Sequence, residues 1–135
     1  MFGTSDELAA FLDKDYIWLG GPWNTDYCRS IGIDGEWCGN GGLSLRHNRR
    51  LAELLETSAH RNDRLKTVED QYITYMLWCE GLAAPAAEGL SFAIDNDAAG
   101  WHERLDRMPW GIHMGNRDAR LYWTEQCPEL SDYTE

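Results

Sequence analysis

The segment Gly39-Asn40-Gly41-Gly42 could bring the backbone of the chain very close to a ligand. Glycine has no side chain to keep a ligand away, and it readily takes the positive φ that a tight turn can require. The segment lacks the lysine and the spacing of a P-loop, and it does not have the G-x-G-x-x-G order of a dinucleotide-binding turn. We expect a loop that either contacts a ligand through its backbone or forms a structural turn.

Two adjacent carboxylates, Glu69 and Asp70, stand at the start of the strongest helix signal in the sequence, residues 67–80. Thr67 and Asp70 have the spacing of a capping box. Acidic residues in a first turn are also favoured by the helix dipole, by about 0.3–1 kcal/mol. A carboxylate held there could instead accept a proton from an attacking hydroxyl group, as a general base does. Both interpretations remain open at this point.

His113 and two D-x-D sequences are the candidates for a metal site. The imidazole of His113 could complete a Mn²⁺ or Mg²⁺ site with carboxylates from elsewhere, or it could be a hydrogen-bonded structural residue. The D-x-D at 13–15 follows a predicted helix and is expected to face solvent. The D-x-D at 95–97 follows the apolar run "LSFAI", and ligands in open α/β sheets gather at the carboxyl ends of strands.

The charge of the chain argues against some partners. Lys and Arg total 12 against 23 Asp and Glu, a net charge of −11, which would repel nucleic acid and anionic lipid. Six basic residues nevertheless lie in one short window, where they could face a compact anion such as a sugar nucleotide or simply be solvated. They are Arg46, Arg49, Arg50, Arg61, Arg64 and Lys66.

The aromatic and apolar residues indicate a soluble protein. Seven tryptophans, several beside glycine or proline, could stack on sugar rings or fill the core. No apolar run approaches the roughly 20 residues of a membrane span, and the N-terminus lacks the features of a secretion signal. Four cysteines without metal or disulfide spacing suit a reducing compartment. We expect a cytoplasmic protein without a membrane segment.

The patterns predict one domain over residues 1–120 and a loose acidic tail over 121–135. Helices and strands alternate, which favours an α/β or α+β fold with a small mixed sheet flanked by helices. A long loop is expected over residues 22–40 because this segment shows little periodicity. The predicted helices cover 5–13 (with a Thr4–Glu7 capping box), 48–59 (capped by Asn48) and 67–80, and the predicted strands cover 16–19, 43–46, 90–94 and 110–114.

Four blocks, "DYIWLGGPWN", "CGNGGLSLRH", "VEDQYI" and "MPWGIHM", resemble in order and spacing the blocks of a DUF5672-like family of glycosyltransferase-like proteins. The resemblance runs from about Asp15 to Met114. It implies a GT-A type fold, in which a half that binds a nucleotide-sugar donor precedes a half that binds the acceptor. It also implies an inverting, metal-dependent transfer of a sugar to an acceptor hydroxyl group.

The resemblance implies a role for each matching residue. Asp70 or Glu69 would be the catalytic base, and His113 would be a ligand of Mn²⁺ or Mg²⁺. Four residues would lie against the sugar or acceptor, Arg46 would steady them or face phosphate, and two tryptophans would line the acceptor site. The four are Gly39, Asn40, Gly41 and Gly42, and the tryptophans are Trp23 and Trp37.

The chain departs from the GT-A order at the D-x-D motif. In GT-A enzymes this motif precedes the glycine block, whereas here "DND" follows it. The chain therefore resembles the C-terminal, acceptor-side half of such an enzyme, as a truncated form would, and a separate N-terminal half or a second copy would be a partner. The alternative is a non-catalytic module that binds carbohydrate or a protein partner, with tryptophans as stacking surfaces and carboxylates as helix caps.

Overall fold

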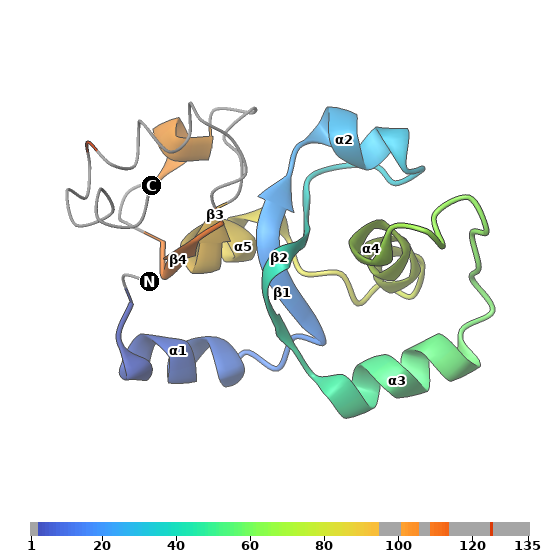
Figure 1. Ribbon diagram of the computed structural model, residues 1–135, viewed down its shortest axis with the longest axis horizontal. Helices are drawn as coiled ribbons and strands as arrows, with labels where there is room; N and C mark the ends of the chain where they lie inside the picture. The colour runs from blue at the N-terminus through green and yellow to red at the C-terminus, as the bar shows by residue number, and fades with distance from the viewer. Residues whose placement is uncertain (1–2, 95–100, 106–108, 114–124, 126–135) are drawn as a thin grey trace.

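The structure, a computed structural model, describes residues 3–94, 101–105, 109–113 and 125 (Figure 1). The predicted "DND" at 95–97 and the predicted tail at 121–135, apart from Glu125, lie outside these ranges. The helices and strands are α1 (Ser5–Leu12), β1 (Trp18–Trp23), α2 (Thr25–Ser30), β2 (Trp37–Arg46), α3 (Asn48–Thr57), α4 (Glu69–Cys79), α5 (Ala86–Phe92), β3 (Ala93–Ile94), the 3₁₀ turn η1 (Trp101–Arg104) and β4 (Gly111–Ile112).

The fold is a mixed α/β arrangement, which confirms the predicted class. β1 and β2 pair antiparallel, and β3 and β4 form a short parallel pair. In Figure 1, α3 and α4 lie on one side of the β1–β2 pair, and α1 and α5 lie on the other. The β1–β2 pair is therefore the central layer between two groups of helices.

Alternation along β1 sends neighbouring side chains into two separate cores. Trp18 packs with residues of α3 and α4, including Leu51, Met76 and Leu77. Leu19 packs on the opposite side in a cluster that includes residues of α1 and α5. Each fully buried side chain of this size contributes about 1.5–3 kcal/mol to folding. Both faces of the strand pair are therefore anchored.

The glycine-rich segment is part of strand β2, so the predicted loop was wrong. Gly20 pairs with Ser44, whereas the next residue, Gly21, pairs with Asn40. Gly41, Gly42 and Leu43 therefore have no partner in β1 and bulge out of the strand. We call these three residues the glycine bulge. Glycine is common at such bulges because its backbone can approach other groups closely.

The predicted long loop at 22–40 was also wrong. β1 continues to Trp23, α2 follows, and β2 begins at Trp37. α2 has only six residues, and its N-cap Asn24 accepts a hydrogen bond from the Tyr27 amide. Such a short helix shows no sequence periodicity, so only its cap could have indicated it.

Local caps were predicted with mixed success. The Thr4–Glu7 capping box is present, and Gly81 follows the end of α4 with a positive φ of 70°. α3 is capped by the His47 side chain and not by Asn48. The predicted strand at 90–94 is mostly helix α5, and only its last two residues form β3. Phe92 is buried and stacks on Trp110, so its apolar character reflects packing rather than a strand.

Helix α5 lies very close to the strands at Gly89. A Cβ atom at this position would lie 2.4 Å from the carbonyl oxygen of Gly20 and 2.5 Å from Cys38 Sγ. Real Cβ atoms essentially never come this close to backbone atoms. The absence of a side chain therefore sets the distance between α5 and β1.

Replacing Gly89 with alanine tests this packing. Helix propensity alone would make Gly89→Ala more stable by about 1 kcal/mol. We expect the close contact to dominate and the variant to lose about 1–3 kcal/mol of unfolding free energy, as overpacked sites do. Ala87→Gly, at an exposed site of the same helix, is the control and should lose only about 1 kcal/mol. Urea denaturation measures both changes, and a stabilised Gly89→Ala protein would contradict the packing argument.

Candidate functional site

Asp70 is directed at the glycine bulge. α4 begins at Glu69, its N-cap is Val68, and it has no side-chain cap, so the predicted Thr67–Asp70 capping box was wrong. One Asp70 oxygen, Oδ1, accepts a hydrogen bond from the Gln71 amide at 2.8 Å. The other, Oδ2, accepts from the amide of Gly41 at 3.3 Å. The carboxylate therefore joins the start of α4 to the bulge.

Side chains also bond two further polar backbone groups of the bulge. The Gly41 carbonyl accepts from Arg46 Nη2 at 3.3 Å and from Ser44 Oγ at 3.4 Å. The Gly42 amide donates to Asn40 Oδ1 at 2.8 Å. Backbone groups that leave a strand ladder need such partners. The bulge is consequently held in one conformation by the residues around it.

Arg46 connects the bulge, α4 and β1. Its Nη1 donates to Glu69 Oε1 at 2.6 Å, and its guanidinium group lies 4.3 Å from the centre of the Trp18 ring. A planar guanidinium group can make several hydrogen bonds and stack on an aromatic ring at the same time. Arg46 thus neutralises Glu69 and holds it to one side of Asp70. We call Gly41, Gly42, Arg46, Glu69 and Asp70 the glycine-bulge site.

His113 covers the far side of the bulge. A Cβ atom at Gly42 would lie 2.4–2.6 Å from three atoms of the His113 ring. Leu43 is similarly close to Gly111 of β4. The bulge therefore contacts both α4 and the segment that carries His113, which is itself exposed.

Among the described residues, no group of three His, Cys, Asp or Glu side chains could hold a metal ion. Asp13 and Asp15 of the first D-x-D are exposed, as expected, and Asp15 pairs with Arg50. The described residues therefore do not fit a metal ion by themselves, because His113 would need oxygen ligands from outside them.

The two predicted acceptor-binding tryptophans lie beside the site but are largely covered. Trp23 is 8% exposed, and its ring lies against Gly39. Trp37 is half-buried and donates from Nε1 to the Asp34 carbonyl. These positions make both residues supports of the strand, and their predicted contact with an acceptor stays a prediction.

Sequence reasoning missed two aromatic residues near the site. Trp18 is buried under Arg46, and its Nε1 is one of the buried polar atoms without a partner in the described part of the chain. Tyr27, from α2, is 39% exposed, and its hydroxyl group accepts from Gln71 Nε2 at 2.7 Å. A predicted strand contained Trp18, but only the register of β1 against β2 places it beneath Arg46.

Four of the six residues in the basic window form ion pairs, among them Arg46 with Glu69. Arg49 pairs with Glu53, and Arg50 pairs with Asp15. Lys66 pairs with Asp63. These contacts favour a solvated, charge-balanced surface over a single basic face.

Cys38 lies in β2 next to Gly39, but its environment makes it a poor nucleophile. Burial raises the pKa of its thiol to about 12, despite lowering by nearby backbone hydrogen bonds. Its Sγ contacts the Pro85 carbonyl at 3.1 Å. Because the thiolate is the reactive form, this cysteine is structural at neutral pH.

Comparison with protein families identifies a match to the chain. A family model described as Protein of unknown function (DUF5672) matches residues 2–113. The chain belongs to this family. The DUF5672 match contains the whole glycine-bulge site and His113. No curated protein and no solved structure matches the chain significantly.

Within the described part of this DUF5672 protein, none of the helices combines the length and the apolar character that crossing a bilayer requires.

Replacing Arg46 tests whether it holds the site together. Arg46→Ala removes three hydrogen-bonding interactions and the stacking on Trp18. We expect it to lower the unfolding free energy by about 1–3 kcal/mol. Arg49→Ala is the matched control, because that side chain is 86% exposed in a surface pair with Glu53. Such a pair should contribute less than about 1 kcal/mol. Equal losses in chemical denaturation would show that Arg46 is no more than a surface residue.

Proposed function

We propose that this DUF5672 protein is glycosyltransferase-like and that its glycine-bulge site receives the acceptor of a sugar transfer. The hydrogen bond from the Gly41 amide to Asp70 carries the proposal, because it places a carboxylate beside the glycine bulge, where Gly42 is exposed. The predicted acceptor-side half of a GT-A enzyme would need this pairing of a base with an open surface. A nucleotide-sugar would be the donor.

Asp70 is the better candidate for the base. Each of its oxygens accepts one backbone hydrogen bond, and a carboxylate oxygen can accept a second. Glu69 is held by Arg46 at 2.6 Å in a charge-assisted hydrogen bond, so its Oε1 is already occupied. In the proposed reaction, the acceptor oxygen bonds to the anomeric carbon, the bond to the departing diphosphate breaks, and Asp70 takes the hydroxyl proton.

The proposal also includes a divalent metal ion and a source of further ligands for it. When bound, a divalent cation would stabilise the departing diphosphate. His113 could contribute one ligand, and oxygen ligands would have to come from the donor, a separate N-terminal half, a second copy or residues outside the described ranges. The residues of the glycine-bulge site do not depend on that ion for their arrangement, because protein groups satisfy them.

A second candidate is a non-catalytic module that binds carbohydrate or a protein partner. It is favoured by the structural partners of both acidic side chains, Arg46 for Glu69 and the Gly41 amide for Asp70. These contacts suffice to explain both residues as connections between α4 and β2. The two candidates differ in what a neutral residue at position 70 would do.

The decisive variant is Asp70→Asn. The asparagine oxygen can still accept from the Gly41 amide, but its NH2 group cannot accept from the Gln71 amide, so the unfolding free energy should fall by about 1–2 kcal/mol. The rate of sugar transfer from a panel of nucleotide-sugars to hydroxyl acceptors should fall by at least about 100-fold. The reactions contain Mn²⁺, and mass spectrometry measures their products. Glu69→Gln is the control and should keep activity within a few-fold.

Amide chemical shifts provide a second measurement that does not require turnover. Titration with methyl glycosides of common hexoses should shift the amides of Gly41, Gly42 and Asp70 in the unmodified chain. Binding that persists in Asp70→Asn, together with no transfer by the unmodified chain, would favour the non-catalytic module. The absence of both transfer and these shifts would contradict the proposal.

A further inference from the structure

A pocket lies on the opposite face of the β1–β2 pair from Asp70. Leu19 and Leu45 pair in register, and their side chains line this pocket. The neighbouring pair, Trp18 and Arg46, belongs to the other face, where Arg46 stacks on Trp18 and bonds Glu69 at the start of α4. The pocket has a volume of about 380 Å³. Small-molecule sites typically occupy about 300–1,000 Å³, so its size suits a small ligand.

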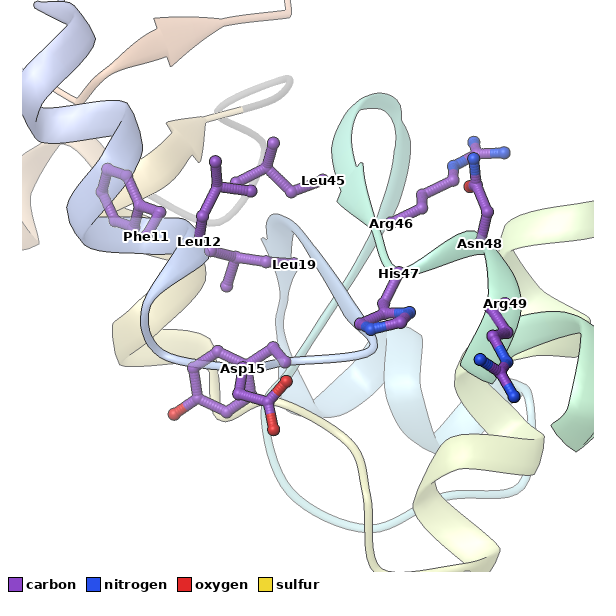
Figure 2. Close-up of a pocket in the computed structure, with 10 residues that line it drawn as sticks. Phe11, Leu12, Asp15, Leu19, Leu45, Arg46, His47, Asn48 and Arg49 are labelled. Carbon is purple, nitrogen blue, oxygen red and sulfur yellow. The ribbon is translucent and has the colours of Figure 1, made fainter.

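One wall of the pocket is apolar. Figure 2 shows Phe11, Leu12, Leu19 and Leu45 grouped on this side. Phe11 and Leu19 are buried, but Leu12 is 61% exposed at the end of α1. An exposed leucine beside a hollow lined by other apolar side chains provides surface for an apolar group.

The charged side chains along the pocket are already balanced. Each has an oppositely charged partner, and in Figure 2 the side chains of Arg46 and Arg49 extend away from the leucines. The pairs are Arg46–Glu69 at 2.6 Å, Arg49–Glu53 at 3.1 Å and Arg50–Asp15 at 2.9 Å. Since the net charge of the chain is −11, a free anion gains no long-range attraction either. The pocket therefore favours an uncharged ligand.

His47 supplies a hydrogen-bond donor. Its Nδ1 accepts from the Arg50 amide at 3.4 Å, which caps α3. Nδ1 therefore carries no hydrogen, and the ring hydrogen is on Nε2. Figure 2 shows the ring lying between the leucines and Arg49, at the edge of the pocket. Nε2 can donate to a hydroxyl or carbonyl oxygen there.

We propose that this pocket binds an uncharged molecule that combines an apolar ring or short chain with one hydroxyl or carbonyl oxygen. The apolar part lies on Leu12, Leu19 and Leu45, and the oxygen accepts from His47 Nε2. This site shares Arg46 with the glycine-bulge site, but it does not depend on the proposed sugar transfer.

Three probes of the same shape and different charge test the proposal: cinnamyl alcohol, cinnamate and cinnamylamine. Titration of the full chain, followed by amide chemical shifts, should give saturable shifts at Leu12, Leu45 and His47 with cinnamyl alcohol. We expect a Kd on the order of 1 mM for a ligand of this size. The two charged probes should bind at least about five times more weakly, because burial penalises their charge.

Two variants separate the apolar and polar contributions. Leu12→Ser should raise the Kd of cinnamyl alcohol about fivefold by removing apolar contact. Leu82→Ser changes another exposed leucine, 41% exposed and outside this pocket, and should leave the Kd unchanged. His47→Asn keeps a favourable N-cap residue but does not reach the ligand, and it should raise the Kd about three- to tenfold.

Melting temperatures of the variants show whether each remains folded. A raised Kd together with an unchanged melting temperature, in Leu12→Ser or in His47→Asn, supports the proposal. Tighter binding of cinnamate or cinnamylamine than of the alcohol would overturn the uncharged ligand. Shifts centred on Gly41 and Asp70, or no saturable shift in any protein, would overturn the site itself.

Discussion

The glycine bulge leaves the β1–β2 ladder, so its backbone amides and carbonyl groups need other partners. Asp70 accepts from the Gly41 amide, and Arg46 donates to the Gly41 carbonyl while it also pairs with Glu69. The start of α4 is therefore joined to the bulge by two carboxylates and one guanidinium group. Because no side chain caps α4 at Val68, the same contacts fix where this helix begins. The position of α4 and the conformation of the glycine bulge therefore depend on each other.

Sequence reasoning succeeded where the determining residues are near each other along the chain. The Thr4–Glu7 cap, the leucines of α3 and the end of α4 at Gly81 all depend on residues within one or two turns. The bulge was taken for a loop because its strand pairing depends on residues about 20 positions away in β1. The short helix α2 gave no periodic pattern. Short-range sequence patterns therefore predicted helices and caps but little of the strand pairing.

The sequence grouped the residues of the candidate site, although their roles stay predictions. Glu69, Asp70, Arg46 and Gly41 were chosen from residue types and family blocks, and the structure brings them into direct contact. Trp18 was missed because its place beneath Arg46 follows from strand register alone. The metal expectation is different: of its candidates within the described ranges, Asp13 and Asp15 are exposed and His113 lies at the bulge. Oxygen ligands for an ion at His113 would have to come from outside the described ranges.

At the end of the β1–β2 pair where Trp18 pairs with Arg46, the two faces have different environments, because successive side chains along a strand point to opposite faces. Arg46 faces α4 and the carboxylates, whereas the adjacent Leu45 faces α1 and the apolar pocket. The charged side contains paired acids and bases around exposed backbone, which suits a polar ligand with hydroxyl groups. The apolar side contains leucines and one imidazole donor.

Glu69 and Asp70 show how neighbouring carboxylates can differ in chemical use. Glu69 is 63% exposed and is bound by a guanidinium group, so accepting a proton would break a charge-assisted hydrogen bond. Asp70 is held by two amide hydrogens, one on each oxygen. These donors fix its direction, and each oxygen keeps a lone pair. Glu69 therefore joins the start of α4 to Arg46, whereas Asp70 is the hydrogen-bond acceptor that faces the bulge.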